Sequence, residues 1–164
     1  MDAFDNSVNI KKDRMRFSKN KLPANLTLLA ILINVFYFVS IYKSNVRYYY
    51  TFSMFLSVIY NLMFMLACFL SSEGIKNYKP MYGIVLIIVG ALQFLRIIYF
   101  PVKAHQTTVT AESQAMVMET AQFIRVIIYL VSSGVTLIAA GVIGYVRSKI
   151  LADYRKTIGE EQPA

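Results

Sequence analysis

Four long apolar stretches constrain this chain more than any other feature of its sequence. They lie at about residues 22–42, 50–70, 81–100 and 123–146, and none of them contains an aspartate or a glutamate. A hydrocarbon core about 30 Å thick needs about 20 consecutive apolar residues in a helix, and a helix satisfies its own backbone hydrogen bonds in lipid. The sequence therefore predicts an all-α integral membrane protein, a bundle of four transmembrane helices.

The composition of the whole chain agrees with this class. Of its 164 residues, 57% are hydrophobic, and the mean hydropathy is +0.50, which is too apolar for a soluble domain of this size. We expect one transmembrane domain, 22–146, between a basic N-terminal segment, 1–21, and a basic tail, 147–164, that continues the fourth helix. The connecting loops are too short to fold alone, since a self-sufficient core usually needs at least about 40 residues. The compact loops and the frequent use of lysine, asparagine, isoleucine and tyrosine are typical of a bacterial protein.

Basic residues outside the apolar stretches predict how the chain threads the membrane. Twelve of them lie in the N-terminal segment, the second loop and the tail, and three lie in the first and third loops. The positive-inside rule then places both termini in the cytoplasm of a multi-pass cell-membrane protein. Counting Arg96 and Arg125 on the outer side leaves twelve against five. Most of the net charge of +8 is then cytoplasmic, where we expect anionic lipids as partners; nothing else supports the rival interpretation, nucleic-acid binding.

The few polar residues of each stretch fall on one side when projected at about 100° per residue. Asn34 and Asn61 belong to such stripes on the first and second helices. The first stripe also holds Thr27, Ala30 and Tyr37, the second Tyr50, Ser57 and Cys68, and a third, on the fourth helix, holds Gln122, Arg125, Tyr129, Ser132, Thr136 and Ala140. In lipid, polar groups turn toward protein or water, so we expect the stripes to meet at the centre of the bundle. The two asparagines either form hydrogen bonds between helices or bind a solute or ion near the midplane.

Glycines spaced seven residues apart indicate close helix contacts. Gly83 and Gly90 lie in the third stretch, and Gly134 and Gly141 lie in the fourth. Small residues let the backbones of membrane helices approach closely. These faces either join the third and fourth helices or form contacts between protomers.

A Gln-x-x-Arg sequence occurs twice, at residues 93–96 and 122–125. The two helices run in opposite directions, so Arg96 and Arg125 reach a similar depth near the outer boundary, where arginine can snorkel to head groups. Gln93, one turn deeper, favours a polar cavity. Our hypothesis is an outward-facing vestibule lined by Gln93, Arg96, Gln122 and Arg125 that binds an anion or a lipid phosphate, because guanidinium groups bind oxyanions in bidentate fashion. We also expect an ion pair between Arg96 and Glu119.

The sequence contains no catalytic or metal-binding motif that we recognise. Its single cysteine, Cys68, and single histidine, His105, rule out a Cys-rich or multi-His metal centre within one protomer, and we expect His105 to be a solvated loop residue. We therefore predict a non-catalytic protein without a metal or cofactor.

Two classes of function remain. The first is an accessory or assembly subunit, or a homo-oligomeric membrane component, whose partner is another membrane protein or a second copy of itself. The second is a small transporter or channel. We favour the first class because the polar stripes are sparse, the spans hold no acidic residue, and no span is interrupted by a proline at mid-membrane depth.

Overall fold

The computed structural model of this chain describes residues 2–42, 51–102, 105 and 118–159, and every regular element in these ranges is a helix. In chain order they are α1 (Asp2–Phe17), α2 (Lys21–Tyr42), α3 (Thr51–Lys76), α4 (Pro80–Ile97), the π-helical turn η1 (Ile98–Val102) and α6 (Thr120–Thr157). Four of them, α2, α3, α4 and α6, are long and apolar enough to cross a membrane. The prediction of an all-helical protein with four such helices is confirmed.

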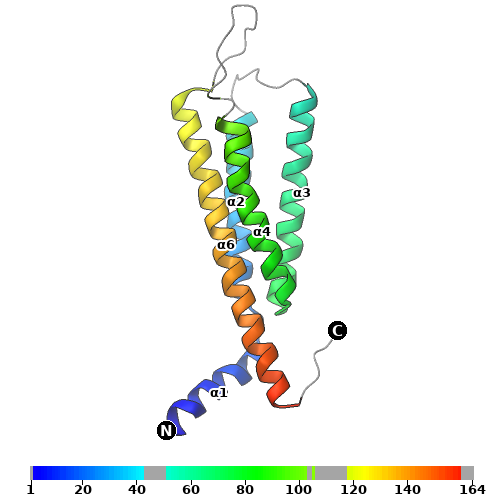
Figure 1. Cartoon of the computed structure of the whole chain (residues 1–164), viewed down its shortest axis with the longest axis vertical. Helices are drawn as coiled ribbons and strands as arrows, with labels where there is room; N and C mark the ends of the chain where they lie inside the picture. Colours follow the sequence, from blue (N-terminus) through cyan, green and yellow to red (C-terminus); the bar gives the residue numbers. More distant parts are fainter. Residues whose placement is uncertain (1, 43–50, 103–104, 106–117, 160–164) are drawn as a thin grey trace, which may run out of the picture.

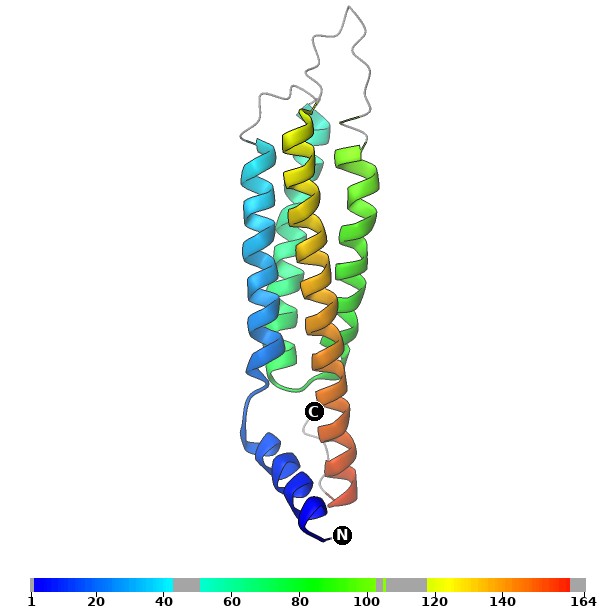
Figure 2. The same ribbon diagram turned by 90° about the vertical axis from the view of Figure 1, so that its left-hand side faces the viewer.

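The four long helices lie side by side and run alternately up and down (Figures 1 and 2). We call the end that carries α1 and the α3–α4 turn the terminal end, and the opposite end the loop end. The helix α6 has 38 residues and extends past the other three at the terminal end, where α1 lies beside it (Figure 1). The helix α1 was not anticipated from the sequence, because its residues are polar and lie outside the four apolar stretches.

Two element boundaries differ from the apolar stretches for local reasons. The helix α3 continues six residues past residue 70, to Lys76, because its last turns lie against the terminal end of the bundle. The helix α4 ends at Ile97, and η1 follows with Pro101 inside it. Proline has no N–H to donate, so it disrupts the hydrogen-bond ladder of an α-helix. The regular helix therefore ends about three residues before the apolar stretch does.

The short turn between α3 and α4 has the geometry of a Schellman motif. The N–H of Lys79 donates to the carbonyl of Gly74 at 3.2 Å, and the N–H of Tyr78 donates to the carbonyl of Ile75 at 3.1 Å. Tyr78 occupies the left-handed position of this motif, with φ of 58°, where glycine is the usual residue. Pro80 then begins α4, where its missing N–H costs least.

The helices α4 and α6 approach each other through their glycines. A Cβ added at Gly141 would lie 2.7 Å from the carbonyl oxygen of Gly83, and one added at Gly134 would lie 3.2 Å from that of Gly90. These distances bring the two backbones into contact. The seven-residue glycine faces therefore join α4 to α6 within one chain, which was the first of the two interpretations left open by the sequence.

Candidate functional site: a buried arginine among polar side chains

Most of the polar residues of α2 and α3 lie where their helical spacing predicted. Asn34, Thr27 and Ala30 are fully buried, and Tyr37 is almost so, so the face of α2 that carries Asn34 is the face that packs. On α3, Asn61 and Cys68 are buried. Tyr50 lies outside the described residues. These stripes therefore face the interior of the bundle, as lipid requires of polar groups.

The polar stripe of α6 lies at the edge of the buried face of that helix: Ala140 is buried, and Gln122, Tyr129, Ser132 and Thr136 are half-buried. The buried residues of α6 include Val126, Ser133 and Leu137, whereas Arg125 is exposed. Counted at about 100° per residue, Arg125 lies roughly 110° from the centre of the buried face. The expectation failed because a hydroxyl can bond within its own helix: Thr136 Oγ1 donates to the carbonyl of Ser132 at 2.7 Å, and such a side chain can then face lipid.

Two buried amides connect α2 and α4 at the level where the sequence placed a cavity. Gln93 Nε2 donates to Asn34 Oδ1 at 3.3 Å, and both residues have no exposed surface. The remaining amide atoms, Asn34 Nδ2 and Gln93 Oε1, have no hydrogen-bond partner within the described ranges. Asn61 makes a local bond, Nδ2 to the carbonyl of Ser57 at 2.9 Å, and no described residue is a partner of its Oδ1. Asn34 therefore joins α2 to α4, whereas the bond of Asn61 lies within α3, and each asparagine keeps one amide atom that is not bonded to another described residue.

Arg96 lies one turn beyond Gln93, in the last turn of α4. Only 9% of its surface is exposed. Its guanidinium carbon lies 4.3 Å from the ring centroid of Tyr37 on α2 and 4.7 Å from that of Tyr60 on α3. We call these three residues the arginine box. Its Nη1 is buried and has no hydrogen-bond partner in the part of the chain that the structure describes.

The interactions within the arginine box stabilise the charge of Arg96 but leave one of its hydrogen-bond donors without an acceptor. A cation over an aromatic ring gains about 0.5–2 kcal/mol, and the carbonyl end of a helix favours positive charge. These terms are comparable with the roughly 2.5–3.5 kcal/mol that arginine costs at the centre of a bilayer, so the charge can be tolerated. A buried donor without an acceptor still costs about 1–3 kcal/mol, and neither ring supplies an acceptor in its face. An anionic oxygen that accepted a hydrogen bond from Arg96 would therefore remove this cost and stabilise the arginine box.

The ion pair expected between Arg96 and Glu119 is not found among the described residues. Glu119 is exposed and precedes α6 in an extended conformation, so it does not lie on the helical face that the expectation assumed. Arg96 points instead between α2 and α3, toward the two tyrosines. Little in the sequence indicated the contact of Arg96 with Tyr60, because Tyr60 lies about 100° around α3 from Asn61 and so fell outside the polar stripe.

The four residues of the expected vestibule occupy three kinds of surroundings. Gln93 and Arg96 are buried. Gln122 is half-buried, and its Nε2 donates to the carbonyl of Ser40 at 3.2 Å, which joins α6 to α2. Arg125 is exposed and near enough to the end of its helix to snorkel. Of the two arginines, only Arg96 lies inside the bundle.

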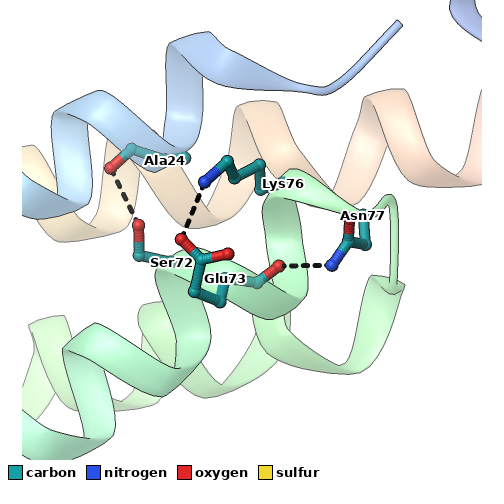
Figure 3. Close-up of polar contacts among 5 residues, drawn as sticks. All are labelled: Ala24, Ser72, Glu73, Lys76 and Asn77. Atoms are coloured by element: carbon teal, nitrogen blue, oxygen red, sulfur yellow. Dashed lines mark hydrogen bonds and ion pairs between the residues drawn. The ribbon is translucent and has the colours of Figure 1, made fainter.

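A second set of polar contacts fixes the terminal end of the bundle. Ser72 Oγ donates to the carbonyl of Ala24 at 3.1 Å, which joins α3 to α2, and Lys76 pairs with Glu73 at 2.8 Å (Figure 3). The backbone N–H of Asn20 donates to the carbonyl of Lys76 at 3.0 Å, and its Oδ1 accepts from Arg147 Nη1 at 3.2 Å. Asn20 is almost fully buried. It therefore ties α3 and α6 to the segment that connects α1 with α2.

His105 is packed, in contrast to the expected solvated loop residue. Its ring stacks on Phe123 with centroids 4.4 Å apart, and Nδ1 lies 3.0 Å from the carbonyl oxygen of Met118. A carbonyl oxygen only accepts, so Nδ1 carries the proton in this contact. Among the described residues no group of three or more His, Cys, Asp or Glu side chains could hold a metal ion.

Comparisons with known proteins add no family to this description. No family model matches the chain, and no curated protein or solved structure matches it. The function therefore has to be argued from the site itself.

Proposed function

We propose that this protein is a small tetraspan component of the cell membrane that acts as a non-catalytic accessory or assembly subunit, either in a homo-oligomer or with a membrane-protein partner. The observation that carries the proposal is that polar side chains inside the bundle form hydrogen bonds from one helix to another. Ser133 donates to the carbonyl of Ala30 at 3.2 Å, and Gln122 donates to the carbonyl of Ser40. With the Gln93–Asn34 and Ser72–Ala24 bonds, these contacts join helices to one another, as expected of a scaffold.

The glycine contacts support the same proposal. The helices α4 and α6 are in backbone contact at both glycine pairs, so no polar route passes between them. The faces left outward carry large apolar side chains, among them Leu62, Ile88 and Val135, each at least half exposed. Such faces suit lipid and the spans of a partner alike.

The proposed orientation places the terminal end in the cytoplasm. The support is the count of basic residues, since twelve of them flank the terminal end of the spans and the positive-inside rule applies to such short segments. There α1 and the extension of α6 form a basic two-helix surface. Lys12 Nζ lies 5.9 Å from the ring centroid of Tyr154, so the two helices are in contact there. This surface would dock anionic lipid head groups or a cytoplasmic partner.

The proposal is tested by purifying the full chain from membranes in a mild detergent. Native mass spectrometry is expected to show one defined oligomer or a stoichiometric partner, and proteoliposomes are expected to show no flux of small anions above protein-free liposomes. Anion flux that is abolished by Arg96→Ala or Arg125→Ala would overturn the proposal and establish the transporter class instead.

A further inference from the structure

We propose that the arginine box, Arg96 with Tyr37 and Tyr60, binds a phosphate-type oxyanion. The starting observation is a charge without a counter-charge. Arg96 is buried, and the four apolar stretches contain no aspartate or glutamate. Among the described residues no carboxylate pairs with it. A cation without a carboxylate partner in the described part of the chain can be satisfied by an anion from outside it.

The geometry of the box indicates which group of the arginine is free. The rings of Tyr37 and Tyr60 contact the guanidinium at its carbon, and rings stack on the faces of such a cation. The N–H groups lie in its plane, and Nη1 is buried without a hydrogen-bond partner among the described residues. An in-plane acceptor with two or three oxygens can therefore bind in addition to the rings, and phosphate has this geometry.

The depth of the box allows two sources of phosphate. Arg96 lies in the last turn of a candidate membrane span that ends at Ile97, and lipid head groups are expected near the ends of such a span. Tyr60 retains 37% of its surface, so the box reaches the outside of the bundle along α3. A phospholipid head group can approach from the bilayer, and inorganic phosphate can approach from the water beyond the loop end. The recognised chemistry is the same in both cases.

The inference goes beyond the proposed function and does not depend on it, because an assembly subunit and a transporter could both carry such a site. The test uses the purified full chain in delipidated detergent micelles. Thermal stability is measured with inorganic phosphate against chloride at equal ionic strength, and with phosphatidylglycerol against diacylglycerol, which lacks the phosphate. Wild-type protein is expected to melt at a higher temperature with one of the phosphate-bearing additions than with its matched control.

Arg96→Met and Arg125→Met form the matched pair of variants, because both arginines lie near the loop end and only Arg96 is buried. The phosphate-dependent rise is expected to persist in Arg125→Met and to be lost in Arg96→Met. Arg96→Lys keeps the charge without the planar fork, and we expect its affinity to fall about tenfold. This variant and the wild-type titration decide the matter if Arg96→Met does not fold.

The arms of the experiment separate the sources. A rise with inorganic phosphate assigns the site to a free anion, and a rise with phosphatidylglycerol alone assigns it to a lipid head group. Equal melting temperatures of the wild type in all four conditions would overturn the proposal. So would a rise that Arg96→Met retains. Loss of a co-purifying polypeptide from Arg96→Met, without any phosphate effect on the wild type, would overturn it too and assign the charge to a partner's carboxylate.

Discussion

At the scale of single residues, the interior of this bundle depends on a few polar atoms whose partners lie on another helix. The bond from Gln93 Nε2 to Asn34 Oδ1 is the clearest case, because both side chains are fully buried. Removing one partner leaves the other without its bond in an apolar environment, whereas removing both does not. The value of such a bond in a membrane averages about 0.6 kcal/mol.

The first prediction follows from this pair. Asn34→Leu and Gln93→Leu are each expected to lower the thermal stability in detergent, and the double variant is expected to lose less than the sum of the two losses. A double-mutant cycle measures the coupling, with Asn25→Leu, at an exposed position of α2, as the control. Strict additivity of the two substitutions would show that the bond contributes nothing.

A second residue-scale prediction concerns the backbone at Tyr78. Its φ of 58° places an L-residue in the left-handed region, at a cost of about 1–2 kcal/mol. Tyr78→Gly is therefore expected to raise the unfolding temperature, although part of the gain is offset by the greater freedom of glycine in the unfolded chain. Circular dichroism during heating measures this. Tyr78→Ala is the control, since it removes the ring and keeps the unfavourable conformation; a rise of equal size in Tyr78→Ala would contradict the backbone explanation.

At the scale of elements, the contact between α4 and α6 is set by the absence of side chains. Gly141→Ala would place its Cβ 2.7 Å from the carbonyl of Gly83 and from Ile87 Cγ1, so the helices must separate. Overpacking of this kind costs about 1–3 kcal/mol. We expect Gly141→Ala to unfold at a lower temperature or at a lower fraction of denaturing detergent. Ala91→Val adds methyl groups at an exposed position of α4 and is expected to leave stability unchanged.

The contact between α1 and α6 carries a prediction for alkaline pH. The pKa of the Tyr154 phenol is raised above its ordinary value, first by partial burial and then by its hydrogen bond to Asp13 and that carboxylate's charge, while Arg16 acts in the opposite direction. Because the pKa is higher when α1 is docked on α6, the protonated phenol favours docking. The contribution of Tyr154 to docking is therefore complete below the ordinary pKa of about 10 and is lost as the pH rises through the raised pKa.

Spin labels at Ile10→Cys and Thr157→Cys, both exposed positions, report the docking of α1 in a Cys68→Ser background. The distance between the labels is expected to lengthen or broaden above about pH 10. The measurement is made with Lys12→Arg, so that the cation over the ring stays charged. Tyr154→Phe cannot ionise and is expected to remove the pH dependence; the same lengthening in Tyr154→Phe would assign it to another group.

At the scale of the whole molecule, the sequence was sufficient for the class and order of the spans but not for the site. Apolar length predicts a span because lipid offers the backbone no partner, and glycine spacing indicated the contact of α4 with α6 as one of two interpretations. The pattern could not show that the Thr136 hydroxyl would donate to the carbonyl of Ser132 within α6, or that the rings around Arg96 would come from α2 and α3. Those contacts depend on helix rotation and pairing, which a single stretch of sequence does not encode.

The last prediction tests the threading of the chain, on which the proposed orientation rests. In a Cys68→Ser background, single cysteines replace Lys79, Thr157 and Glu119, which are all exposed in the structure. Lys79 and Thr157 lie at the terminal end and Glu119 lies at the loop end, so a bilayer must separate them. With a membrane-impermeant maleimide on intact cells, Glu119→Cys is expected to be labelled, while Lys79→Cys and Thr157→Cys are labelled only after permeabilisation. Cys68→Ser alone gives the background. The reverse pattern would invert the orientation, and labelling of Lys79→Cys and Glu119→Cys from the same side would show that α4 does not cross the membrane.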